Sequence, residues 1–334
     1  MMDRRAFIGC LGLGVLARSR DVRAQPARRV PRIGILSFAG TTAEIAGPEP
    51  RRASAKFLVR GLRELGYEYG RDFVTEPRGA EGRPELWPNQ ATEMVRLAVD
   101  VIVAPGPYLP ALKRATSTIP IVMAAGSDPV GDGYARSLSR PGGNITGLSL
   151  QEIETTGKRL ELLKELVPSA APVAVLWNNV TPHSARYWQA AEAAAEKRGW
   201  KLLKLEIRDA GEIERAFKTA AAARAGALLT IASSLLFGRA RQLAELAAVN
   251  RLPAMYDLPE YVEAGGLIGY GADLDEIWRR AAAFVDKILK GAQPAELPIE
   301  QPSKFNLVLN LKAAKALGLT IPPSLLARVD QVIE

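Results

Sequence analysis

Hydroxyl, carboxyl, amide and aromatic side chains recur at the carboxyl ends of short apolar segments in this sequence. Such segments are typical of parallel strands, whose carboxyl ends lie together at the ligand-binding edge of an open α/β sheet. A carboxylate there can receive an ammonium group, a hydroxyl or amide can bond a carboxylate or an amine, and a tyrosine suits a planar ligand. The candidate ligand-binding residues are Ser37, Phe38, Gly106, Tyr108, Asp128, Asn178, Ser233, Ser234, Tyr256, Asp257 and Tyr270.

Most of these candidates also have a structural interpretation, which the sequence leaves open. Ser37 could cap a helix, Phe38 could belong to the core, and Asp128 could accept hydrogen bonds from its own turn. The tyrosines at strand ends could be packing residues. Gly106 is a candidate because the absence of a Cβ atom allows a ligand to approach the backbone closely.

The residues needed for catalysis do not occur in a recognisable pattern. His183 is the only histidine, so neither a metal cluster nor a histidine-assisted nucleophile has a second partner. No glycine-rich dinucleotide or phosphate-binding motif is present, and no pair of carboxylates is marked as acid and base. We therefore expect no enzyme activity, no cofactor and no metal site, and we interpret His183 as a capping or surface residue.

The candidates lie on a chain in which short strands alternate with helices. The predicted strands are 32–38, 73–76, 101–104, 121–124, 173–177, 201–205, 227–231, 254–256, 267–270 and a strand-like 299–309. The predicted helices are 53–65, 87–98, 109–115, 156–166, 184–198, 213–223, 238–250 and 276–289. This alternation predicts parallel sheets with helices on both faces.

The series of strands and helices divides into two halves at a turn-rich stretch, 127–144. The elements after 267 are too few for a third domain, so they complete the two lobes and the chain crosses between them several times. The predicted fold class is therefore α/β, with two doubly wound parallel-sheet lobes that face each other across a ligand cleft. The expected division is 30–146 plus 268–300 for the first lobe and 147–267 plus 301–334 for the second.

The N-terminus has the layout of a secretory signal peptide. A basic pair, Arg4 and Arg5, precedes the twelve-residue apolar run 6–17, and cleavage is expected after Ala24. The run is shorter than the roughly 20 residues that span a bilayer. The twin-arginine and the general secretory routes both stay open, because Asp3 stands where the twin-arginine pattern usually has Ser or Thr.

Two other interpretations of the N-terminus are an uncleaved signal anchor and a cytoplasmic protein with an apolar start. Cys10 does not fit a lipoprotein signal, because most of the apolar run follows it. Cleavage would remove this single cysteine, which excludes disulfides from the mature chain. It would also remove five arginines and two aspartates, which lowers the formal charge from +8 to +5. The basic residues are dispersed, which favours solvated helix faces over nucleic-acid binding.

Several motifs resemble those of a known family. They are Thr118–Val122, Ser127–Val130, Arg140–Gly147, Lys158–Leu163, Tyr261–Gly266 and, most specific of all, the ending Phe305–Pro322. Together they resemble the ABC-transporter substrate-binding proteins related to the tryptophan-type binding proteins. The resemblance extends from about Pro31 to Glu334.

This resemblance implies a type I periplasmic-binding fold with three hinge crossings, in which the lobes close on a ligand. It further implies a periplasmic monomer that delivers an amino acid or an aromatic compound to an ABC permease and its ATPase. The alternative is a periplasmic sensor that docks onto a membrane receptor. Two loops, 104–107 and 178–182, depart from the family pattern, so the ligand is expected to differ from that of better-known members.

Overall fold

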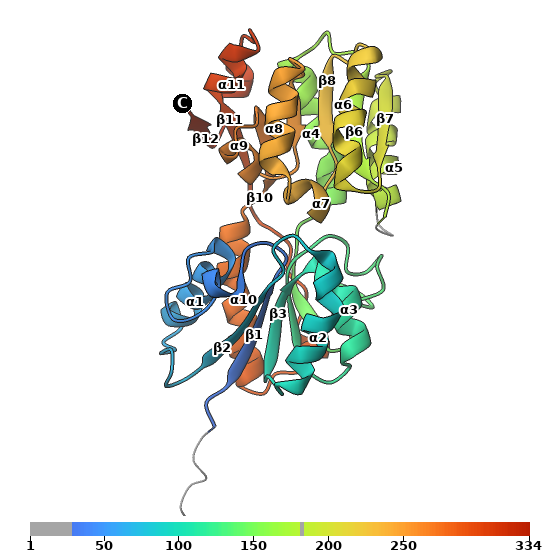
Figure 1. Cartoon of the computed structure of the whole chain (residues 1–334). Helices are drawn as coiled ribbons and strands as arrows, with labels where there is room; N and C mark the ends of the chain where they lie inside the picture. The colour runs from blue at the N-terminus through green and yellow to red at the C-terminus, as the bar shows by residue number, and fades with distance from the viewer. Residues whose placement is uncertain (1–28, 181–183) are drawn as a thin grey trace, which may run out of the picture.

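The chain forms two α/β lobes joined by strands and loops that pass between them (Figure 1). The structure, a computed structural model, describes residues 29–180 and 184–334. The expected export signal and His183 lie outside the described residues. Within the described ranges, no helix is both long and apolar enough to cross a membrane.

The first lobe consists of one sheet with two helices on each face. Its elements are β1 Arg32–Ser37, α1 Ala53–Glu64, β2 Val74–Gly79, α2 Trp87–Arg96, β3 Val101–Pro105, α3 Leu109–Ala115, β4 Ile121–Gly126, β5 Ile145–Ser149 and α10 Leu274–Leu289. The five strands are all parallel, in the order β2-β1-β3-β4-β5. Helices α1 and α10 cover one face, and α2 and α3 cover the other (Figure 1). Successive strand residues therefore pack on opposite layers, as Val101 and Ile102 do.

The second lobe is built in the same way on a larger sheet. Its elements are α4 Glu152–Leu166, β6 Val173–Asn178, α5 Ser184–Glu196, β7 Leu202–Ile207, α6 Ile213–Ala222, β8 Ala227–Thr230, α7 Ser234–Phe237, α8 Ala240–Val249, β9 Ala254–Tyr256, α9 Glu260–Glu263, β10 Ile268–Ala272, β11 Phe305–Asn310, α11 Leu311–Ala316, α12 Pro323–Leu326 and β12 Gln331–Ile333. The order is β12-β11-β10-β9-β8-β6-β7, and only β10 and β11 pair antiparallel. Helices α4 and α5 pack on one face, and α6 and α8 pack on the other.

Three crossings join the lobes. The chain passes from β5 to α4 through Gln151, whose φ of 51° is left-handed, from β10 to α10 through Asp273, and from Glu300 to β11. We expected 268–300 in the first lobe, but β10 pairs with β9 and β11 in the second sheet. That crossing therefore follows β10 instead of preceding it, because the unpaired edge of β9 takes β10 as its neighbour.

The predicted helices and all predicted strands but one are confirmed within a few residues, whereas β5, β12 and the short helices α7, α9, α11 and α12 were not predicted. Strand β5 was not predicted, because its five residues follow a run of turn formers and contain Gly147. The strand-like segment 299–309 is a strand only from Phe305, since Ile299 and Glu300 bond the first lobe instead.

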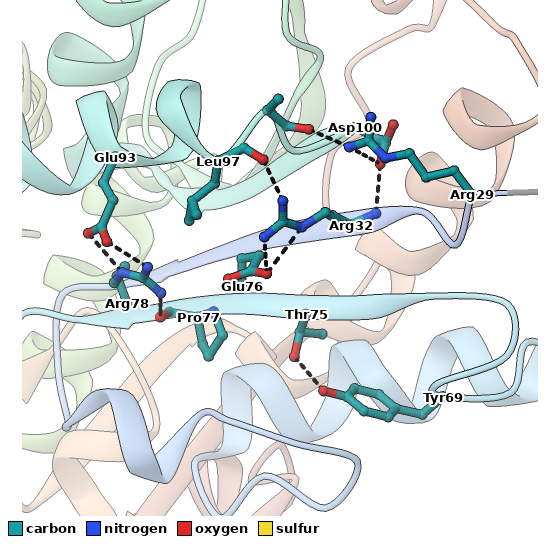
Figure 2. A network of polar contacts seen from close by, with 11 residues as sticks. Arg29, Arg32, Tyr69, Thr75, Glu76, Pro77, Arg78, Glu93, Leu97 and Asp100 are labelled. Carbon is teal, nitrogen blue, oxygen red and sulfur yellow. Dashed lines mark hydrogen bonds and ion pairs between the residues drawn. The ribbon is translucent and has the colours of Figure 1, made fainter.

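A polar network holds the amino ends of the first-lobe strands, at the end of this lobe far from the second lobe (Figures 1 and 2). The backbone N–H of Arg32 donates to Asp100 Oδ2 at 2.7 Å. The Arg32 guanidinium donates to Glu76 at 2.6 Å and to the Leu97 carbonyl at 2.8 Å (Figure 2). These bonds connect β1 to β2 and to the loop before β3. They fix the first strand where the described chain begins, at the edge of the sheet opposite the carboxyl ends of its strands.

Candidate functional site

A cavity of about 700 Å³ lies between the two lobes. Its first-lobe wall is formed by the ends of β1, β3 and β4 and by the start of α2 and the length of α3. Its second-lobe wall is formed by the residues after β6, β8 and β9 and by the starts of α4 and α5. The volume is in the range of small-molecule sites. Because both lobes line it, a molecule bound here would contact both.

The structure brings six of the eleven predicted binding residues to this cavity. They are Phe38, Gly106, Asp128, Ser233, Ser234 and Asp257. They come from the ends of β1, β3, β4, β8 and β9, as the strand-end pattern predicts. Their role in ligand binding stays a prediction.

Two predicted residues of the first lobe have other contacts. The Ser37 hydroxyl donates to the backbone carbonyl of Ala39 at 2.6 Å. Tyr108 is fully buried, and its hydroxyl donates to the Ser37 carbonyl at 3.1 Å and lies 2.6 Å from Gln90 Oε1. Tyr108 thus supports the end of β1 from behind and does not line the cavity.

Three predicted residues of the second lobe also lie outside the cavity wall. The Asn178 amide donates to two backbone carbonyls at the end of β7. The Tyr256 ring stacks on Tyr261 with centroids 4.9 Å apart, and Tyr270 stacks on Phe305 at 5.7 Å. In these contacts the three side chains pack the lobe itself.

Aromatic rings and prolines dominate the apolar part of the cavity wall. Phe38 of the first lobe meets Phe237 of the second edge to face, with centroids 5.5 Å apart. Trp87 and Tyr134 add two further rings on the first-lobe side. The Trp87 Nε1 atom is buried without a hydrogen-bond partner. The lining prolines are Pro84, Pro88, Pro105, Pro107, Pro110 and Pro129. This wall suits a planar apolar molecule.

An ion pair crosses the cavity between the lobes. Arg186, at the start of α5, lies 2.6 Å from Asp128 Oδ2 and also pairs with Asp132 in the first lobe. A Cβ atom on Gly131 would lie 1.5 Å from the Arg186 guanidinium, so glycine is needed for this close approach. Arg186 therefore links the two lobes across the cavity.

Replacing Arg186 by glutamine is expected to favour an open arrangement of the lobes. Loss of a partly buried pair with two carboxylates costs about 1 kcal/mol, which lowers the ratio of closed to open molecules roughly fivefold. Small-angle scattering of the ligand-free protein should then give a larger radius of gyration. The control is Arg215→Gln, which removes an exposed pair with Glu212 inside one lobe. Equal radii for Arg186→Gln and wild type would contradict the role given to Arg186.

A second polar link runs from the first lobe into the core of the second. Ser127 Oγ donates to Glu152 Oε2 at 3.1 Å, and the Tyr187 hydroxyl donates to the same oxygen at 2.7 Å. Arg159, which is 1% exposed, lies behind this link. Its guanidinium donates to the backbone carbonyls of Tyr270, Glu152 and Asp257 at 2.8, 3.2 and 3.0 Å. Arg159 thereby ties α4 to β9 and β10.

Asp257 places a carboxyl group at the back of the cavity. One oxygen accepts a bond from the Thr230 hydroxyl at 3.2 Å. The pKa of Asp257 is raised to about 7, because burial and the Glu152 charge outweigh the opposing effect of the nearby Arg159 guanidinium. Among the described residues, no three His, Cys, Asp or Glu side chains are placed to hold a metal ion.

Sequence reasoning missed several residues of the cavity wall. Arg186 and Glu152 lie in the first turns of helices, Trp87 begins α2, and Phe237 ends the short α7. Their positions in the sequence could have identified those in first turns, because the first turn of a helix that follows a strand faces the same edge of the sheet as the end of that strand.

Comparison with known proteins supports the family resemblance. The family described as ABC transporter substrate binding protein matches residues 45–333. The chain belongs to this family. A tyrosine-binding protein of Clostridioides difficile (strain R20291) is 25% identical over 265 residues, which cover 79% of this chain and 76% of that protein.

Solved structures show that this substrate-binding protein has the type I periplasmic-binding fold. A conserved domain protein from Vibrio cholerae superposes with a TM-score of 0.82, at 27% identity, over 91% of this chain and 100% of its own. The ABC domain from Streptococcus pneumonia in complex with L-Trp gives 0.81, at 25% identity, with the same coverage of both chains. The fold class predicted from the sequence is therefore confirmed.

A third solved structure has the same fold. The ligand-free, open structure of a substrate-binding protein with adhesive properties from Clostridium difficile gives a TM-score of only 0.67. Its identity, 24%, and its coverage, 91% of this chain and 99% of its own, are nearly the same as for the complex.

Proposed function

We propose that this substrate-binding protein is the extracytoplasmic component of an ABC importer. It captures a small molecule with an aromatic or similar apolar body, such as an amino acid or an aromatic compound, and delivers it to a membrane permease. The observation that carries the proposal is the cavity between the lobes, which both lobes line with aromatic and charged side chains.

Three further observations support this function. The family is defined by substrate binding, and relatives include a tyrosine-binding protein and a complex with L-Trp. The N-terminal sequence has the layout of an export signal. The ion pair of Arg186 and the ring contact of Phe38 join the lobes across the cavity, so a ligand between them would stabilise the closed form.

The first test is a thermal-shift screen of the mature protein against amino acids, aromatic acids, aromatic amines, nucleosides and sugars. A ligand present at 100 times its Kd adds about 2.7 kcal/mol to stability. We expect one chemical class with an apolar ring to raise the melting temperature. A shift with sugars alone, or with no compound at all, would contradict the proposed ligand class.

A matched pair of variants then shows whether binding takes place in the cavity. Trp87→Ala removes a lining ring and should weaken binding about tenfold or more, as loss of a central aromatic contact does. Trp200→Ala is the control, because Trp200 lies at the surface of the second lobe, away from this cavity. Equal losses in the two variants would argue against the cavity as the site.

A further inference from the structure

The cavity between the lobes has more acidic than basic side chains. Asp128 and Asp132 line it from the first lobe, and Glu152 and Asp257 line it from the second. Arg186 pairs with both first-lobe aspartates, whereas among the described residues no ion pair joins Glu152 or Asp257 to a basic side chain. A cation beside Glu152 and Asp257 is attracted by their negative charge and favours the ionised form of Asp257, whereas an anion there is repelled.

Two other arginines lie near the cavity. Arg159 lies behind the wall and donates its bonds to three backbone carbonyls. Arg114 lines the cavity from the last turn of α3 in the first lobe, where it is exposed to solvent. Among the described residues, the lining arginines are therefore Arg186, which already has two carboxylate partners, and the exposed Arg114.

The first-lobe loops offer few N–H groups to a carboxylate. Pro105, Pro107 and Pro129 line the cavity just after β3 and β4, and proline has no N–H. The Gly131 N–H already donates to Asp128 Oδ1 at 2.8 Å. In open α/β sheets, N–H groups at these positions commonly bind anions. The first-lobe loops therefore offer fewer N–H groups to an anion. The hydroxyl groups of the opposite wall carry no charge that would attract one.

The aromatic rings of the cavity favour the same kind of ligand. Phe38, Phe237 and Trp87 present rings to the cavity alongside the carboxyl groups. Aromatic faces attract ammonium groups, tryptophan most strongly, and they also pack against a flat apolar body. Carboxyl groups and rings together form a complementary surface for an apolar amine.

We propose that this cavity selects an organic ammonium ion with an aromatic body and no carboxylate, that is, an arylalkylamine in preference to the corresponding amino acid. This inference rests on the proposed function and specifies its substrate class. The Asp257 and Glu152 side of the cavity receives the ammonium group, and the ring wall of Phe38, Phe237 and Trp87 receives the aromatic body.

The test compares three compounds that share an indole ring. Tryptamine carries only the ammonium group, L-tryptophan carries both charges, and indole-3-acetate carries only the carboxylate. Isothermal titration at neutral pH should show tryptamine binding at least about tenfold more tightly than L-tryptophan, a difference of about 1.4 kcal/mol, with indole-3-acetate weakest. The measurement uses the wild-type protein, so its result does not depend on whether a variant folds.

Two variants separate charge recognition from packing. Asp257→Asn should reduce the preference for tryptamine over L-tryptophan, and Glu152→Gln offers a second test if Asp257→Asn is unstable. Asp209→Asn, an exposed aspartate outside the cavity, should leave the preference unchanged. L-tryptophan binding as tightly as tryptamine, or no tryptamine binding at about 1 mM, would overturn this inference. The proposed function would still stand if another aromatic compound of the screen binds in the cavity.

Discussion

Replacing Arg159 by methionine is expected to lower the free energy of unfolding by about 3–5 kcal/mol. The guanidinium is 1% exposed and donates to three backbone carbonyls on α4, β9 and β10. Methionine fills much of the same space but donates no hydrogen bond. The substitution would also leave the buried Asp257 carboxyl group without the positive charge beside it. Urea unfolding of the two proteins measures the difference.

Two further variants show whether charge or geometry is responsible. Arg159→Lys keeps the charge, but one ammonium group cannot reproduce the planar arrangement that reaches three carbonyls, so a substantial part of the loss should remain. Lys158→Met is the control on the same helix, since Lys158 makes only an exposed pair with Glu161. A loss below about 1 kcal/mol for Arg159→Met would contradict the interpretation.

The alternation of strands and helices was predictable from the sequence because most strands are short apolar runs with clear flanking turns. The limits of α3 and β9 match the prediction in full. Strand β5 was not predictable, because Gly147 has a φ of 130° and a Cβ atom there would lie 2.1 Å from the Met123 carbonyl oxygen. The need for glycine at this position follows only from the contact of β5 with β4. The pairing of β10 likewise depends on its neighbours in the sheet.

The candidate site was predictable where one strand end sufficed to place a residue. Asp128 and Asp257 follow β4 and β9 directly, and both line the cavity. Tyr108 follows β3 just as closely, but its hydroxyl turns inward to the Ser37 carbonyl. Arg186 could not be placed from the sequence, because its partners belong to the other lobe. A residue whose partners belong to the other lobe cannot be placed by considering one strand end at a time.

Stability is expected to fall as the pH rises from about 5 to 8, because two buried carboxyl groups of the second lobe resist ionisation. Burial, together with the charges of Glu263, Asp275 and Asp257, raises the pKa of Glu260 to about 8. The Glu260 Oε2 atom is buried without a hydrogen-bond partner. Burial also raises the pKa of Asp257 to about 7.

The sign of the effect follows from proton binding in the two states. Between the ordinary pKa, 4.5 for glutamate, and a pKa of about 8, the folded protein holds a proton on Glu260 that the unfolded chain has lost. The free energy of unfolding therefore falls by up to roughly 1.4 kcal/mol per pH unit over this window for this group. Carboxyl groups with a lowered pKa, such as Glu276 bonded to Arg279, lose their contribution only as the pH falls below about 4.5.

Urea unfolding at about pH 5.5 and pH 8 tests this expectation. The wild-type protein should be less stable at the higher pH by an amount of the order of 3 kcal/mol from Glu260 alone. Glu260→Gln keeps the shape without the ionisation, so its stability should depend much less on pH. Glu245→Gln, on the exposed side of α8, should behave like wild type. A wild-type stability that stays constant or rises over this range would show that these carboxyl groups ionise freely. The cavity beside Asp257 would then be wetter than the 1% exposure of this residue implies.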